Sequence, residues 1–260
     1  MDSNGDGVGD LAGITSKLDY LNDGTPCSLG VDAIWLSPVY PSANVDWGYD
    51  VLDYCDVDPA FGSLTEFDEM VRAAHARGIR VIMDFVPNHT SDRHPWFLES
   101  ATTRDNPKRD WYSWADPSPT GGPPNNWLSA FHYLDWAWML DGRTGQYYLH
   151  SFAPTQPDLN WRNPQVRRAM HQVLCFWLDR GVDGFRIDVI HRMLKDGELR
   201  DNHADVAHLR RDLDEHVRPL RNMDHPDNHD VVRVFRRTVA THGDRRRMRI
   251  RHRCSASSGG

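Results

Sequence analysis

The repeated order of an amphipathic helix, a glycine and a short apolar strand is the feature that most constrains the fold of this chain. Three segments, residues 31–38, 79–87 and 182–190, are short, β-branched and apolar at successive positions. Such runs are typical of strands buried on both faces of a parallel sheet. Predicted helices end at Gly78 and Gly181, just before the second and third strands. This order predicts a β/α barrel or a doubly wound sheet.

The predicted helices carry recognisable end signals. Ser63 and Glu66 form a capping box before an apolar stripe. Asn163 is a predicted N-cap, and Pro164 takes the first helical position of the next helix. A last helix is predicted over roughly residues 230–241. We expect no fourth buried strand after it, because the chain continues from Asp244 as RRRMRIRHRCSASSGG.

The stretch from about residue 90 to residue 154 interrupts this rhythm. It is rich in Pro, Gly, Trp and Asn, has weak periodicity, and is too long for an ordinary loop. We therefore expect an inserted subdomain. The predicted division is residues 1–89 for the first part of the barrel, 90–155 for the insert, 156–244 for the rest of the barrel, and 245–260 for a basic tail unlike a native sequence.

Charge and cysteine content exclude several classes of function. The formal net charge of −7 does not favour nucleic acid or an anionic membrane as a partner. The four cysteines lack CxxC spacing, which argues against a zinc site or a disulfide framework. No apolar run approaches the roughly 18 residues of a membrane span, and no leader is recognisable. We expect a soluble, cytoplasmic protein of undetermined oligomeric state.

Polar residues gather where two of the predicted strands end. Arg186 and Asp188 are two positions apart, so their side chains project from the same face of the third strand. Asn88 and His89 follow the second strand at the same rim of a parallel sheet. In barrels this rim carries the active site, and a guanidinium beside a carboxylate favours a nucleophilic, ionised acid. The alternative is a buried Arg–Asp pair that only stabilises the barrel.

Several short motifs carry a family resemblance. DFVPNHT, QPDLN and GFRIDVI, in this order, resemble conserved regions of the α-amylase superfamily, glycoside hydrolase family thirteen. QPDLN, NWRNPQVRRAM, DWGYD and HPWF resemble its oligo-1,6-glucosidase and α-glucosidase branch. The resemblance covers residues 2–244 and implies a partial (β/α)8 TIM barrel. In that reading the chain holds strands two to four, with the insert between the third and fourth strands, as a fragment shortened at both ends.

The resemblance also implies roles for individual residues. Asp188 would be the nucleophile of a retaining double displacement, and Arg186 its charge partner. Asp46, Tyr49 and His89 would hold the glucose ring. The implied substrates are α-1,4- or α-1,6-linked gluco-oligosaccharides, and the implied activity is that of a glycosidase.

Two smaller features refine this interpretation. Val189 resembles the residue found after the nucleophile in members that accept α-1,6 bonds, whereas Trp47 departs from the Asn that relatives often carry before Gly-Tyr.

The N-terminal sequence DSNGDGVGD offers oxygen ligands at alternate positions around glycine turns, as Ca²⁺ requires. The set is Asp2, Asn4, Asp6, the Val8 carbonyl and Asp10. In the glucosidases that this chain resembles, the same loop binds a structural calcium, so we expect Ca²⁺ as a structural cofactor.

The second carboxyl group of a retaining glycosidase is not found at its expected place. Such enzymes need a nucleophile and a proton donor about 5–5.5 Å apart. In the family the donor is a Glu on the strand after the nucleophile. The last glutamates here, Glu198 and Glu215, do not match that motif. The NHD sequence at residues 228–230 resembles a late family motif, but it lies too close to Asp188, and we predict a helix in the residues that follow it.

Three alternatives to an impaired α-glucosidase remain from the sequence. The chain could be a non-catalytic sugar-binding fragment, or a related trehalose or sucrose isomerase. Binding of nucleic acid through the basic residues 245–253 is the third alternative, and the net negative charge disfavours it.

Overall fold

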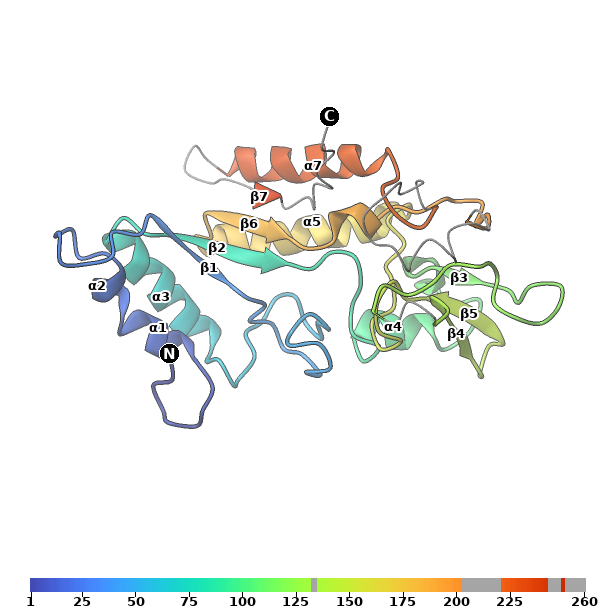
Figure 1. Cartoon of the computed structure of the whole chain (residues 1–260), viewed down its shortest axis with the longest axis horizontal. Coiled ribbons are helices and arrows are strands. Elements are labelled where there is room, and N and C mark those ends of the chain that lie inside the picture. The colour runs from blue at the N-terminus through green and yellow to red at the C-terminus, as the bar shows by residue number, and fades with distance from the viewer. Residues whose placement is uncertain (132–134, 203–220, 243–248, 251–260) are drawn as a thin grey trace, which may run out of the picture.

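The computed structural model describes residues 1–131, 135–202, 221–242 and 249–250 of the 260-residue chain. A four-stranded parallel sheet and a separate three-stranded antiparallel sheet organise it (Figure 1). The parallel sheet has the order β1-β2-β6-β7, with strands Ala33–Leu36, Arg80–Phe85, Gly184–Ile187 and Arg249–Ile250. The helices are α1 (Leu11–Thr15), α2 (Leu18–Leu21), α3 (Leu64–Ala76), α4 (Pro95–Ser100), α5 (Pro164–Asp179) and α7 (Asn228–Thr241).

Successive parallel strands are joined by helical crossovers. α3 precedes β2, α5 precedes β6, and α7 precedes β7 along the chain. All three strand pairs are parallel, and the register places Asp84 of β2 opposite Arg186 of β6. This is the arrangement of consecutive β/α units, and it confirms the prediction of a partial (β/α)8 barrel.

The ends of the long helices follow the predicted signals. The hydroxyl of Ser63 accepts a hydrogen bond from the Glu66 amide. The same hydroxyl donates a hydrogen bond of 2.8 Å to the Glu66 carboxylate. The Asn163 side chain accepts from the Gln165 amide at 2.8 Å, directly before Pro164. Each cap satisfies an amide group that has no partner within its helix.

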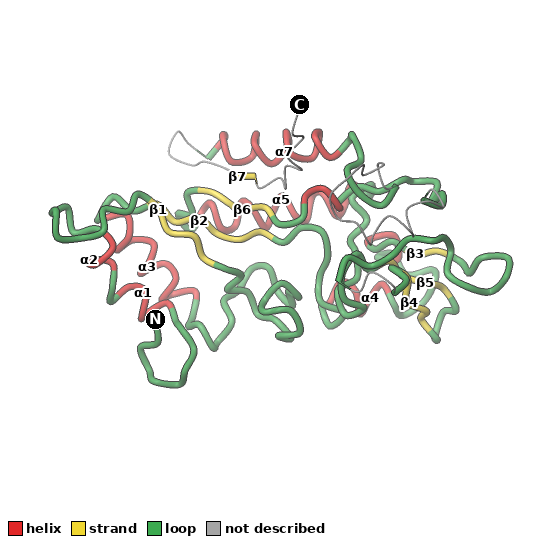
Figure 2. Tube along the Cα trace, in the orientation of Figure 1, coloured by secondary structure: helices red, strands yellow, loops and turns green. Residues whose placement is uncertain are grey.

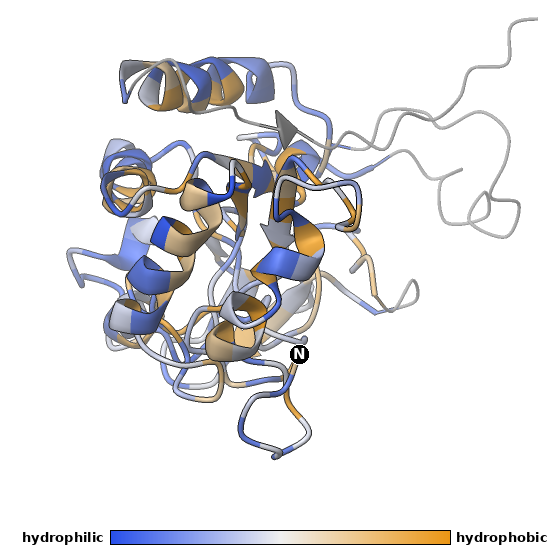
Figure 3. Cartoon of the chain, turned by 90° about the vertical axis from the view of Figure 1, so that its left-hand side faces the viewer, coloured by the Kyte–Doolittle hydropathy of each residue, from blue (hydrophilic) through white to orange (hydrophobic). Residues whose placement is uncertain are grey.

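Most of the core lies between the parallel sheet and the helices. Trp177 of α5 packs edge-on against Phe67 of α3, with ring centroids 4.9 Å apart, and both side chains are fully buried. Phe85 of β2 contacts Phe235 of α7 in the same way at 5.6 Å. Hydrophobic residues gather on the helix faces that point inward, and hydrophilic residues cover the outside (Figure 3).

The inserted segment forms its own small sheet at one side of the parallel sheet (Figure 2). Its strands are β3 (Trp114–Ala115), β4 (Trp138–Asp141) and β5 (Gln146–Leu149), in the order β3-β5-β4. A second hydrophobic cluster sits on this sheet and contains Trp127, Ala137, Trp138 and Leu149. One short 3-10 helix, Arg109–Trp111, precedes β3, and another, Ile190–Arg192, follows β6.

Two predictions about strands are corrected. β1 is not buried on both faces, because Trp35 is 50% exposed. β1 lies at the edge of the described sheet and so has a neighbouring strand on one side only. A strand does follow the last helix. Residues 249–250 pair in parallel with β6, although they belong to the segment in which we expected no strand. Strand pairing uses main-chain groups, so an unsuitable side-chain pattern does not prevent it.

The NHD sequence forms the first turn of α7, which begins two residues before the predicted start near Asp230. The Asn228 side chain accepts a hydrogen bond from the Leu194 amide and donates one to the His191 carbonyl. It therefore fixes the segment that follows β6.

Within the described part of the chain, no helix is long and apolar enough to cross a membrane.

Removing the buried ring of Phe67 tests this packing. We expect Phe67→Ala to lower the free energy of unfolding by about 3–5 kcal/mol, through lost burial and the cavity left beside Trp177. Leu98→Ala is the control, because Leu98 is 51% exposed, and it should change stability by only about 0.5 kcal/mol. Urea unfolding measures both. Equal losses for the two variants would contradict the described core.

Candidate active site

The carboxyl ends of β2 and β6 bring together a guanidinium and two carboxylates. Nη1 of Arg186 lies 2.9 Å and 3.1 Å from the two carboxylate oxygens of Asp84. The same nitrogen lies 2.8 Å from Oδ1 of Asp188. The Asp188 amide donates to the Phe85 carbonyl at 2.8 Å, which extends the strand pairing by one residue. Arg186 therefore bridges two acids on neighbouring strands.

Opposing effects set the protonation of these two acids. Burial raises the pKa of Asp188, Arg186 lowers it, and the carboxylate of Asp46 raises it. Burial also raises the pKa of Asp84 to about 7, against the lowering effect of Arg186. Asp84 is fully buried, whereas the Asp188 side chain keeps 13% exposure. Asp188 is the acid of this pair that a ligand can reach.

Tyr49 joins the same network from the loop after β1. Its hydroxyl donates to Oδ2 of Asp84 and accepts from Nη1 of Arg186, both at 3.2 Å. Burial, with the nearby Asp84 carboxylate, raises the pKa of Tyr49 to about 12. Tyr49 is therefore a neutral hydroxyl at physiological pH.

Gln156 connects two more of the predicted site residues. Its Nε2 donates to Oδ2 of Asp46 at 2.9 Å and lies 3.2 Å from Nε2 of His89. His89 is buried, and this burial lowers its pKa to about 4. His89 is thus a neutral imidazole near pH 7, able to donate or accept one hydrogen bond without adding charge.

The structure therefore brings the five predicted residues into two adjoining groups. Arg186, Asp188 and Tyr49 form one group, in direct contact. Asp46 and His89 form the other group through Gln156, and the charge of Asp46 acts on Asp188. Gln156 belongs to the QPDLN motif, and its contact with these two side chains was not predicted.

Two residues beside the site have a left-handed backbone. Val189, directly after Asp188, has φ of 37°, and Trp47, directly after Asp46, has φ of 50°. This region is unfavourable for residues other than glycine, most of all for a β-branched one. Both strained positions adjoin a carboxylate of the site, which is where such strain is most often retained.

A buried ion pair next to the site was not anticipated. Nζ of Lys195 lies 2.6 Å from Oδ2 of Asp158, and both residues are buried. The Asn88 side chain donates to Asp158 at 3.0 Å and accepts from Lys195 at 3.2 Å. Nδ2 of Asn88 lies 3.2 Å from Nδ1 of His89. Asp158 stands in the quoted QPDLN motif, but nothing in the sequence around Lys195 indicates burial.

The N-terminal loop folds back on itself through its own acidic side chains. The carboxylate of Asp2 accepts from the amides of Gly5 at 2.7 Å and Gly7 at 2.8 Å. These bonds, that of Gly7 first, lower the pKa of Asp2. Asn4 and Asp6 are linked side chain to side chain at 3.1 Å. Asp10 instead caps α1 by accepting from the Gly13 amide at 2.6 Å.

No cluster of three or more His, Cys, Asp or Glu with metal-binding geometry occurs among the residues that the structure describes. Such a cluster would not include Asn4 or the Val8 carbonyl, because an amide side chain and a main-chain carbonyl are ligands of other types.

The carboxylates around Asp188 in this network are aspartates. Glu198 is exposed and pairs with Arg200 at 3.3 Å. Glu215 lies outside the described residues.

Comparison with known proteins yields a family match and close relatives. The family described as "Alpha amylase, catalytic domain" matches residues 1–253. A probable α-glucosidase of Rhizobium meliloti is 50% identical over 243 residues, which are 91% of this chain and 43% of that protein. An oligo-1,6-glucosidase of Parageobacillus thermoglucosidasius is 54% identical over 200 residues, covering 77% of this chain and 34% of that protein.

The solved structures agree with these relatives. Trehalose-6-phosphate hydrolase of Bacillus licheniformis superposes with a TM-score of 0.85 at 40% identity, over 96% of this chain and 41% of the hydrolase. The chain thus spans less than half the length of each of these three proteins.

The buried, neutral state of His89 has a measurable consequence. A histidine with a folded pKa of about 4 binds fewer protons than an unfolded one with a pKa near 6.5 over the interval between these values. Its contribution to stability is therefore complete near pH 7 and is lost as the pH falls toward 4.

We expect acidification from pH 7 to pH 5 to destabilise the wild type more than His89→Gln, by about 2 kcal/mol. Urea unfolding at both pH values measures the difference. His229→Gln is the control, because His229 is exposed and the variant should keep the wild-type pH dependence. An identical pH dependence for wild type and His89→Gln would refute a buried, neutral His89.

Proposed function

Because this chain belongs to the α-amylase family, we propose that it acts on α-glucosides, with the carboxylate of Asp188 attacking the sugar. The observation that carries this proposal is the 2.8 Å contact of Arg186 with Asp188 at the end of β6. Burial raises the pKa of Asp188, and the neighbouring guanidinium of Arg186 opposes this by stabilising the ionised form. Asp188 is thereby kept nucleophilic in a site that is largely closed to water.

The proposed reaction has two displacements. An oxygen of Asp188 forms a bond to the anomeric carbon while the bond from that carbon to the leaving oxygen breaks. The leaving oxygen takes up a proton, and the glucosyl unit stays bound to Asp188 as an ester. A water then attacks the same carbon, loses a proton, and releases glucose with the Asp188 carboxylate restored.

The surrounding residues provide binding and orientation. Asp46 accepts hydrogen bonds from sugar hydroxyls, and the neutral His89 donates to them, with Gln156 holding the two side chains in place. Tyr49 and Asp84 fix the guanidinium of Arg186 on their side of the site. Charge developing on the sugar ring in the transition state is cationic, and the adjacent Asp46 carboxylate favours it electrostatically.

The proposed substrates are α-1,4- or α-1,6-linked gluco-oligosaccharides. The names of the two curated relatives support this class. The α-1,6 linkage is further supported by Val189, the residue directly after Asp188. Its strained backbone fixes where this side chain lies relative to the nucleophile.

Of the steps in this reaction, protonation of the leaving oxygen is the one that the residues of the described network support least. We therefore propose that the chain handles leaving groups that need no proton far better than natural sugars. The absence of a general acid typically costs about 10²–10⁴-fold in rate.

Trapping with an activated 5-fluoro-α-glucosyl fluoride tests the nucleophile. Fluoride leaves without a proton, so we expect a glucosyl ester on the peptide that contains Asp188, detected by mass spectrometry. Asp188→Asn should abolish this adduct, whereas Asp183→Asn, on the same strand segment but paired with His75 at 2.6 Å, should keep it. Labelling of another residue, or none in a folded chain, would overturn the proposal.

We also propose that the N-terminal loop binds one structural Ca²⁺. The side chains of Asp2, Asn4, Asp6 and Asp10, with the Val8 carbonyl, are oxygen ligands of the kind that calcium prefers. The ionised Asp2 carboxylate supports this assignment. Asp10, which caps α1, joins the loop to the barrel through its bond from Ser3 at 2.9 Å. Binding there would hold the start of the chain against α1.

Thermal unfolding with and without calcium checks this site. At a concentration of roughly one hundred times Kd, calcium should raise Tm by about 5–10 °C, because it binds only the folded state. Asp6→Ala should remove this shift. Asp105→Ala, at an exposed aspartate outside the loop, should keep it. A calcium response that survives Asp6→Ala would exclude the loop as the binding site.

A further inference from the structure

A cavity of about 200 Å³ lies apart from the proposed catalytic residues. None of Asp46, Tyr49, His89, Arg186 and Asp188 lines it. Three segments form its walls, namely the inserted sheet with the segments beside it, residues 159–162 before α5, and residues 193–199 after β6. The cavity therefore sits at the junction between the insert and the segment that continues from Asp188.

We propose that this cavity binds one pyranose unit of an α-glucoside, as a sugar site distinct from the catalytic one. The choice of ligand class rests on the proposed function. The site itself rests on the size, lining and charge of the cavity.

The size of the cavity suits a single sugar ring. At roughly 30 Å³ for each water, it has room for about six or seven water molecules. It is also smaller than the roughly 300–1,000 Å³ of pockets that hold drug-sized ligands. A single monosaccharide unit fits a cavity of this size, whereas a nucleotide or a longer oligosaccharide does not.

The lining combines aromatic walls with polar groups. Trp114, Trp127, Trp138 and Trp161 are among the residues that line it, together with Asp110 and Asn160. Trp127 and Trp138 are stacked, with ring centroids 6.0 Å apart. A pyranose has apolar C–H faces and a polar edge of hydroxyls, so it requires aromatic surface and hydrogen-bonding groups in the same pocket.

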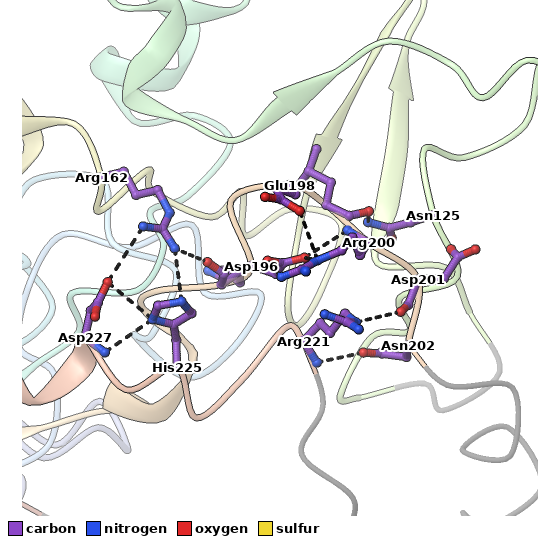
Figure 4. A network of polar contacts seen from close by, with 12 residues as sticks. Asn125, Arg162, Asp196, Glu198, Arg200, Asp201, Asn202, Arg221, His225 and Asp227 are labelled. Atoms are coloured by element: carbon purple, nitrogen blue, oxygen red, sulfur yellow. Dashed lines mark hydrogen bonds and ion pairs between the residues drawn. The ribbon is translucent and has the colours of Figure 1, made fainter.

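Three charged residues that line the cavity, Asp196, Arg162 and Lys195, already have partners of opposite charge. Figure 4 shows Asp196 held by Arg200, at 2.7 Å and 2.8 Å. Arg162 donates to the Lys195 carbonyl at 2.6 Å and lies 3.9 Å from Asp227. A charged ligand that binds at any of these three groups would have to disrupt its existing pair. An uncharged polyol can instead use the remaining hydrogen-bonding capacity of the same groups.

Gly197 provides a way to fill the cavity. It lines the cavity, and its backbone is not left-handed, so an L side chain is tolerated there. A Cβ at this position would lie 3.1 Å from Nε of Arg162, a flexible side chain that is 41% exposed and can move. Gly197→Phe should therefore occupy the space proposed for the sugar. Gly142→Phe is the matched control, because a Cβ at Gly142 has nothing within 4 Å.

Saturation-transfer NMR with methyl α-D-glucopyranoside tests the proposal on the full chain. The background is Asp46→Ala with His89→Ala, which removes binding at the proposed catalytic residues. We expect binding to persist in this background with a millimolar Kd. Gly197→Phe should weaken it by about tenfold or more, whereas Gly142→Phe should leave it unchanged. Arg162→Ala, which removes a group from the rim, provides a second test if Gly197→Phe does not fold.

Either of two results would overturn the proposal. One is binding that Gly197→Phe or Arg162→Ala leaves intact in a folded chain, and the other is no binding in the Asp46→Ala, His89→Ala background. The trapping experiment at Asp188 judges the catalytic proposal independently of both results.

Discussion

The guanidinium of Arg186 is the group on which the arrangement of the site depends. Parallel pairing of β2 with β6 places Asp84 directly opposite Arg186, and Asp188 follows two residues later on the same face. One nitrogen, Nη1, contacts both carboxylates and the Tyr49 hydroxyl. Charged groups this close to the core are tolerated only when they are paired. The strand register and the electrostatics of Asp188 are therefore parts of one constraint.

A second buried pair anchors the insert beside this centre. Asp158 comes from the segment that returns from the insert to α5, and Lys195 comes from the segment that follows β6. Their 2.6 Å contact joins these two parts of the chain, and Asn88, at the end of β2, bonds to both. Because Asn88 also lies against His89, the placement of the insert and the orientation of His89 are coupled.

The loops between these anchors complete the candidate site. Asp46 and Tyr49 lie on the loop after β1, whose left-handed Trp47 and Gly48 let the chain turn between them. Gln156 crosses from the returning segment to contact Asp46 and approach His89. Three segments that are distant in sequence, carrying Asp46, His89 and Gln156, thus meet at the Gln156 side chain. The cavity beside Trp127 and Trp161 lies where the insert and the segment after β6 meet again.

The sequence alone determined the repeated β/α units, the helix ends at Ser63, Asn163 and Gly181, and the candidate residues of the site. These features arise from local spacing, capping chemistry and short motifs, which need no knowledge of distant contacts. Four features follow from long-range contacts instead: the exposure of Trp35, the pairing of residues 249–250 with β6, the burial of Lys195 and the contacts of Gln156. Each of these depends on which segment lies alongside. The sequence of an edge strand can look like that of an interior strand. In the same way, a lysine that is buried cannot be told from one at the surface by its sequence alone.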